Sequence, residues 1–187
     1  IDGAGGTIEP IGFYHTERAN GTLYDKSKIF NGTFDGAGYV IKNFKIYGLG
    51  YYFTELLGAT GSNYDRDVTR VYKIGTALFA GLGDSSIVKN LGVESVSYGG
   101  NYKFDTPSAS GLTYSITHSS AVFFVDCSSS AEITNCYSKG CTGFSSGFGS
   151  GAFTDTYPEV SNCYLSSSAG IGFGCDTTDS IFVPQSG

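Results

Sequence analysis

Ile133-Thr134-Asn135-Cys136 is one of four copies of a short pattern: an apolar residue, any residue, an asparagine and a second apolar residue. The other copies are Ile41-Lys42-Asn43-Phe44, Val88-Lys89-Asn90-Leu91 and Val160-Ser161-Asn162-Cys163. Successive asparagines are 47, 45 and 27 residues apart, and an apolar cluster with a Phe precedes each copy. Repeats at such distances are typical of proteins built from stacked structural units.

The pattern has a physical meaning for the path of the backbone. Side chains of a straight strand alternate between its two faces, so both apolar residues cannot reach one core. A corner at the asparagine removes this conflict, and asparagine tolerates the left-handed conformation that a sharp corner needs. We therefore predict one column of corner asparagines whose amides bond neighbouring coils, formed by Asn43, Asn90, Asn135 and Asn162.

These repeats predict an all-β fold, a single right-handed parallel β-helix (β-solenoid) that spans residues 1–187. The handedness is the one that parallel crossovers generally adopt. Two polar and aromatic stretches, near residues 51–70 and 99–119, interrupt the repeat. We expect them to leave the solenoid as loop insertions on one side, where function is most often found.

Composition limits the class of partner. Charged residues make up 15% of the 187 residues, against about 25% in ordinary domains. The net charge of −6 argues against nucleic acid, because phosphate contacts need clustered Lys and Arg. No apolar run approaches the roughly 20 residues of a membrane-spanning helix, and no motif calls for a cofactor. Because the chain begins at Ile1 without a signal-peptide pattern, we interpret it as a mature or excised product.

The stretch from Phe30 to Ile46, with its Phe34-Asp35-Gly36-Ala37-Gly38 segment, resembles the opening of GLUG-motif repeat domains. Pro10-Ile11-Gly12 resembles the residues upstream of that opening, and residues 133–138 and 160–165 resemble the recurring strand of the same family. Such domains occur in large bacterial surface proteins. The resemblance implies a β-solenoid that serves as a surface or spacer module without catalysis.

Two sequons and the general composition bear on the compartment. Asn20-Gly21-Thr22 and Asn31-Gly32-Thr33 are N-glycan acceptors if the chain passes through a eukaryotic secretory pathway; otherwise their Asn-Gly pairs form turns. Low Lys content with abundant Ser, Thr, Gly and Tyr favours an extracellular or cell-surface protein.

The five cysteines all lie in the last third of the chain: Cys127, Cys136, Cys141, Cys163 and Cys175. No C-x-x-C pair exists and both histidines are far away in sequence, so we predict no metal site. Cys136 and Cys163 fall in one inward column, where they either pack as small apolar side chains or form a disulfide. Cys141 and Cys175 are a second candidate pair, and an odd thiol could link to another chain.

Parallel β-helices include polysaccharide lyases and hydrolases, which need converging carboxylates. The acidic candidates do not recur in register on the repeat, so we predict no catalytic residue; they are Asp65, Asp67, Asp105, Asp126, Asp176 and Asp179. Tyr137 and Tyr164 are expected to form one outward column. Such rings either bind sugar or stack to stabilise the sheet.

The sequence leads to the hypothesis of an extracellular, non-catalytic structural or adhesive module. Its first coil is predicted to lack a cap, and an open coil can pair with another chain. We therefore expect end-to-end self-association into a filament, or contact with other surface proteins. The alternative is a carbohydrate-active enzyme or a sugar-binding module on a parallel β-helix.

Overall fold

The computed structural model describes residues 1–12, 15–19, 22–25, 27–47, 51–57, 69–99, 113–144, 149 and 158–167. For residues 15–19, 22–25, 51–57, 69–74, 113–118 and 167 it describes the backbone alone. These parts of the chain contain strands and turns but no helix. The all-β prediction with parallel strands is confirmed.

Two parallel ladders form the regular part of the molecule. The first ladder pairs its strands in the order β17-β15-β10-β4, with bounds Glu159–Ser161, Glu132–Thr134, Ile87–Lys89 and Thr33–Asp35. The second ladder has the order β18-β16-β11-β5, with bounds Tyr164–Ser167, Tyr137–Cys141, Gly92–Glu94 and Val40–Lys42. Every neighbouring pair in both ladders is parallel.

Two shorter ladders add to these passages of the chain. The third ladder pairs β1, β6 and β12 in parallel, with bounds Thr7–Ile8, Lys45–Ile46 and Ser97–Tyr98. The fourth ladder pairs β9 and β14, with bounds Phe79–Leu82 and Phe124–Cys127. Single bridges extend the fourth ladder at both ends, from Ile11 to Phe79 and from Phe124 to Gly149.

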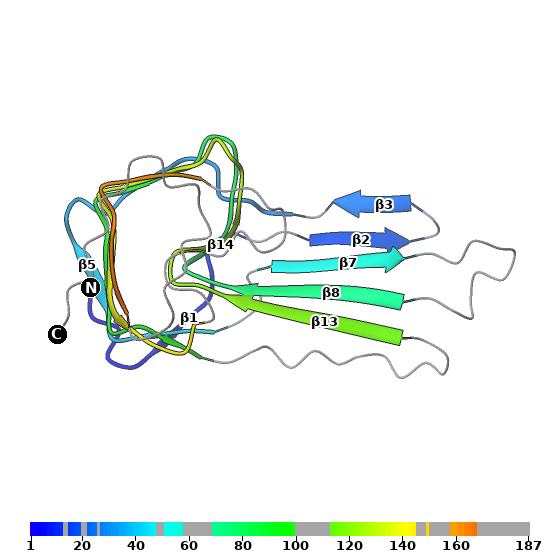
Figure 1. The fold of residues 1–187 in the computed structure, drawn as a ribbon, viewed down its shortest axis with the longest axis horizontal. Coiled ribbons are helices and arrows are strands. Elements are labelled where there is room, and N and C mark those ends of the chain that lie inside the picture. The colour runs from blue at the N-terminus through cyan, green and yellow to red at the C-terminus, as the bar shows by residue number, and fades with distance from the viewer. Residues whose placement is uncertain are drawn as a thin grey trace, which may run out of the picture.

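The chain therefore visits the same ladders in the same order in successive layers, which lie on one another in Figure 1. We call residues 30–46, 79–98, 124–142 and 159–167 layers 1 to 4. Residues 1–8 precede them as a partial layer, which reaches the second and third ladders through Asp2 and β1. The corner between the first and second ladders is called the first corner, and the next one, before the third ladder, is the second corner.

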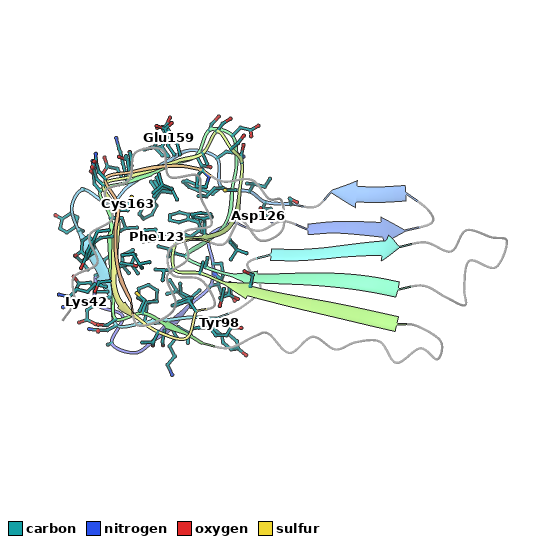
Figure 2. The ribbon with its side chains drawn as sticks, in the orientation of Figure 1. Lys42, Tyr98, Phe123, Asp126, Glu159 and Cys163 are labelled. Atoms are coloured by element: carbon teal, nitrogen blue, oxygen red, sulfur yellow. The ribbon has the colours of Figure 1, made fainter. Side chains whose placement is uncertain are left out.

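The core lies inside the layers. Phe79 is fully buried, with ring centroids 5.4 Å from Phe30 and 5.3 Å from Phe34. Figure 2 shows Phe123 and Cys163 directed inward and Glu159 at the outer surface. Full burial of one such apolar side chain stabilises a fold by about 1.5–3 kcal/mol. Inward columns repeated from layer to layer thus hold the stack together.

A five-stranded sheet extends from one side of the stack (Figure 1). Its order is β13-β8-β7-β2-β3, with bounds Thr113–Ser120, Thr69–Thr76, Tyr51–Leu57, His15–Ala19 and Thr22–Asp25. Its strands β8 and β13 lead directly into layers 2 and 3, and the pairing continues there through Leu78 and Val122. Strands thus occupy residues 51–57, 69–70 and 113–119 of the two stretches for which we expected loops. Residues 58–68 and 100–112 lie outside the described residues.

Candidate functional site

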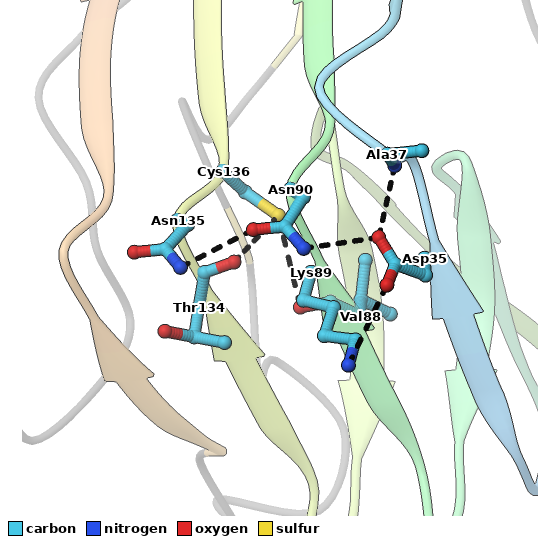
Figure 3. A network of polar contacts seen from close by, with 8 residues as sticks. All are labelled: Asp35, Ala37, Val88, Lys89, Asn90, Thr134, Asn135 and Cys136. Carbon is cyan, nitrogen blue, oxygen red and sulfur yellow. Dashed lines mark hydrogen bonds and ion pairs between the residues drawn. The ribbon is translucent and has the colours of Figure 1, made fainter.

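The first corner carries a column of three asparagines. The pairing of β10 with β15 and of β15 with β17 places Asn90, Asn135 and Asn162 one above another. Each has a positive φ, of 54°, 52° and 50°. The Asn135 side-chain amide donates to Oδ1 of Asn90 over 3.2 Å (Figure 3). The repeat predicts the corner conformation of all three residues, and it predicts the side-chain bond that joins Asn135 to Asn90.

Asn43 does not belong to this column, which corrects the prediction for that residue. Lys42 pairs with Glu94, so Asn43 lies at the second corner, beside Ser95. Its φ of 59° is left-handed too, as are those of Ser95 and Gly140 at the same corner of layers 2 and 3. Both corners place an apolar residue after a left-handed one, so the same four-residue pattern arises at either. In layer 1 the first corner is a longer turn over residues 36–39.

Sequence reasoning missed two aspartates, Asp35 and Asp2. Each lies at the N-terminal end of a column of stacked corner residues. Asp35 accepts hydrogen bonds from the Ala37 backbone N–H (2.9 Å) and from Asn90 Nδ2 (3.0 Å), and Lys89 Nζ lies 3.5 Å from it (Figure 3). At the second corner Asp2 repeats this arrangement with Ala4, Asn43 and Lys42. We call these two arrangements the aspartate clamps. A signal for them exists in the sequence, since Asp-Gly-Ala-Gly occurs at residues 2–5 and again at 35–38.

The aspartate clamps favour ionised carboxylates. The backbone N–H of Ala4, then the Asn43 amide, lower the pKa of Asp2 below its usual 3.8. The Asn90 amide, then the Ala37 backbone N–H, lower the pKa of Asp35 in the same way. Hydrogen bonds donated to a carboxylate stabilise its charged form. Because each aspartate uses its acceptors on the turn and on the next layer, the aspartate clamps serve structure.

Tyr137 and Tyr164 are register partners on the outer face of the second ladder. The Tyr137 ring covers Gly92, where an added Cβ would lie 2.5 Å from the ring, and its hydroxyl donates to Glu94 Oε1 over 2.8 Å. Burial, and then this contact with Glu94, raise the pKa of Tyr137. Both rings are partly exposed. Two such rings beside a carboxylate offer an apolar face and a hydrogen-bond acceptor, the elements of a sugar-binding surface.

The four described cysteines are buried: Cys127, Cys136, Cys141 and Cys163. Cys136 and Cys163 lie in register on adjacent layers, directly before Tyr137 and Tyr164. Cys141 is paired with Ser167 in the second ladder, and Cys175 lies outside the described residues. Burial raises the pKa of the Cys141 thiol.

The remaining candidate residues are dispersed. Of the acidic candidates, Asp126 is fully buried and accepts a bond from the Cys127 backbone N–H, while the other five lie outside the described residues. Asn31 is exposed with its side chain over Gly83, and Asn20 lies outside the described residues. No group of three or more metal-binding side chains occurs in the part of the chain that is described. Nor does that part contain a helix long and apolar enough to cross a membrane.

A cleft of about 490 Å³ opens where the β2–β3 hairpin leaves layer 1. Its walls are residues 9–12 and 28–30. The ionisable side chains among them are Glu9 and Lys28, and Ile11, Ile29 and Phe30 supply apolar surface. The described walls of the cleft thus present one carboxylate and one amine beside apolar surface.

Next to this cleft, β4 is an edge strand. Its pairing in the described residues is with β10 alone. The bonds from Ile87 N–H to Gly32 O and from Gly36 N–H to Lys89 O fix which residues face β10. Backbone direction alternates along a strand, so the N–H and C=O groups of Thr33 and Asp35 face away from β10. An edge of this kind can accept another strand.

Comparison with known proteins adds no relative: no protein-family model, no curated protein and no solved structure matches this chain.

Proposed function

We propose that this chain is an extracellular, non-catalytic structural or adhesive module, built as a single right-handed parallel β-solenoid. The observation that carries the proposal is the stacking of layers 1 to 4, in which inward columns supply the core and corner residues bond between layers. Such a stack is extended by adding layers, and its ends accept further strands. The resemblance to GLUG-motif repeat domains supports the same function.

End-to-end association follows from the edge at β4. A strand from a second copy could add there, because the backbone groups of Thr33 and Asp35 face away from β10. The contact would be head to tail and so would not close on itself.

The experiment is electron microscopy with analytical ultracentrifugation of the isolated protein and of two variants. Thr33→Pro removes the outward N–H but keeps the bonds to β10, whereas Thr33→Ala keeps the N–H and serves as the matched control. We expect filaments or oligomers for the parent and for Thr33→Ala, and a marked loss for Thr33→Pro. Monomers at all concentrations, or equal assembly of both variants, would contradict self-association through β4.

A second candidate function is sugar binding, and the pairing of Tyr137 with Tyr164 beside Glu94 favours it. Glycan-array binding tests this function, with Tyr164→Ala expected to abolish binding and Tyr39→Ala, at an exposed ring in another layer, expected to preserve it. Turnover of the same glycans, measured in parallel, tests the carbohydrate-active enzyme. Absence of binding at millimolar glycan would leave the structural module as the function.

A further inference from the structure

Two nearly identical hexapeptides lie on each other in layers 3 and 4. Glu-Ile-Thr-Asn-Cys-Tyr covers residues 132–137, and Glu-Val-Ser-Asn-Cys-Tyr covers residues 159–164. The ladders pair Thr134 with Ser161 and Tyr137 with Tyr164, so the residues between them are also in register. Cys136 and Cys163 are therefore direct neighbours across two layers.

Both thiols point into the core and take equivalent positions. Cys136 Sγ donates to Thr134 O (3.3 Å) and lies 3.7 Å from Val88 O, which belongs to the layer before it. Cys163 Sγ donates to Ser161 O (3.2 Å) and lies 3.6 Å from Ile133 O, in the layer that holds Cys136. The Cys163 thiol is thus directed towards the layer of its neighbour.

The backbone spacing also suits a covalent bond. Neighbouring strands lie about 4.8 Å apart, within the roughly 4.4–6.8 Å between Cα atoms that disulfides span. The backbone bond from Tyr164 N–H to Cys136 O (3.0 Å) holds the two strands together at this point. Of the other described cysteines, Cys141 is paired with Ser167 and Cys127 with Leu82.

We propose that Cys136 and Cys163 form a disulfide that joins layers 3 and 4 when the protein meets an oxidising thiol–disulfide buffer. One thiolate attacks a small-molecule disulfide such as oxidised glutathione and releases one reduced glutathione. The second thiolate then displaces the other glutathione and closes the Cys136–Cys163 bond. Two electrons thus pass to the reagent, which leaves as two reduced thiols. That the bond forms in the protein's own compartment rests on the proposed extracellular function.

Cys163 is the better attacking group. Its side chain is 5% exposed against 1% for Cys136. The hydrogen bond with Cys136 lowers the pKa of Cys163, and the same bond, together with burial, raises the pKa of Cys136.

The test is a peptide map of the full chain after equilibration with oxidised and reduced glutathione and alkylation of free thiols in denaturant. We expect a linked peptide pair that contains Cys136 and Cys163 and has lost two hydrogens. Closing a loop of this length predicts a melting temperature about 5–10 °C higher than that of the reduced protein. Cys163→Ala should lose this redox-dependent shift, whereas Cys127→Ala, at a buried cysteine of the fourth ladder, should keep it.

The map of the parent protein decides the question even if a variant fails to fold. Alkylation of both Cys136 and Cys163 in the oxidising buffer, or a bond from either one to another cysteine, would overturn the pairing. These results would leave the structural-module proposal standing, because that proposal is tested by assembly and not by thiol content.

Discussion

The two corners of the stack impose the same backbone demand and meet it with different side chains. At the first corner, layers 2 to 4 use asparagine throughout, and Asn135 bonds to Asn90 in the layer before it. At the second corner the left-handed residues of layers 1 to 3 are Asn43, Ser95 and Gly140. The comparison separates two contributions: the conformation, which several residues can adopt, and the amide bond between layers, which needs asparagine.

Glycine substitutions should show the largest difference between the corners. A Cβ at Gly36 would lie 2.5 Å from Asn90 O and 2.8 Å from Leu91 Cα, both backbone atoms of the next layer. Gly36→Ala should therefore lower the free energy of unfolding by about 2–3 kcal/mol. At the second corner, Gly140→Ala meets nothing closer than 3.8 Å and bears only the strain of φ +62°, about 1 kcal/mol. Urea unfolding measures the loss in free energy of unfolding for both variants. Equal losses would show that the backbone around Gly36 moves apart at little cost to admit the added Cβ.

Asn90 tests the amide bonds directly. Asn90→Ala keeps a Cβ at φ 54° without a polar side chain and removes the bonds to Asp35 and Asn135, a loss of about 2 kcal/mol. Asn90→Gly removes the same bonds but suits the conformation, so about half of that loss is expected. Urea unfolding of the two variants separates the contributions. If Asn90→Gly matched the parent, the asparagine column would serve the conformation alone.

A substitution at Ser95 can give the second corner of layer 2 the asparagine that the first corner uses. Ser95 has a φ of 51°, and asparagine adopts this region more readily than serine does. Ser95→Asn should raise the free energy of unfolding by about 0.5 kcal/mol, while Ser95→Val, a β-branched control, should lower it by about 1–2 kcal/mol. Thermal and urea unfolding give the values. A destabilised Ser95→Asn protein would show that the second corner has no room for an amide.

Acid should weaken the aspartate clamps. The resulting loss in the free energy of unfolding should be smaller than those of the substitutions above, because both carboxylates are exposed. Their folded pKa lies below 3.8, so between the two values the folded chain binds fewer protons than the unfolded one. The stability they contribute is present above pH 3.8 and is lost as the pH falls below it. Asp35→Asn should lose stability at about pH 6 and show a shallower decline between about pH 4 and pH 2. An unchanged slope in urea unfolding would contradict the role of the Asp35 carboxylate.

How much of this the sequence can predict differs between the parts of the molecule. The column of Asn90, Asn135 and Asn162 follows from the repeat, because corner and inward apolar residue recur together. The prediction for Asn43 is wrong because a left-handed residue followed by an apolar one fits both the first and the second corner. The four-residue pattern alone therefore does not identify the corner at which a copy lies. Register decides this, and it depends on the extra residues of the 36–39 turn.

The projecting sheet and the aspartate clamps escape sequence reasoning for different reasons. Strand β13 pairs with β8 over eight residues that lie 44 positions away, and Thr113–Ser120 contains too few apolar residues to predict a strand. Strands β8 and β13 are specified by the layers that they enter. The aspartate clamps are visible as a repeated tetrapeptide, but their meaning depends on Lys-Asn in the following layer, which only the stacking brings near. The pairing of Tyr137 with Tyr164 and of Cys136 with Cys163 can be predicted from the sequence, because these residues lie in two similar hexapeptides.

The long connections all leave the stack between the third and fourth ladders or within the fourth. Layer 2 reaches layer 3 there through more than twenty residues, whereas layer 3 crosses the same gap, from Thr142 to Gly149, with six. The cost of closing a loop grows slowly with its length. The connection between the third and fourth ladders is therefore a position that should tolerate insertions. An epitope or a reporter domain could be inserted there while the register of the layers is retained.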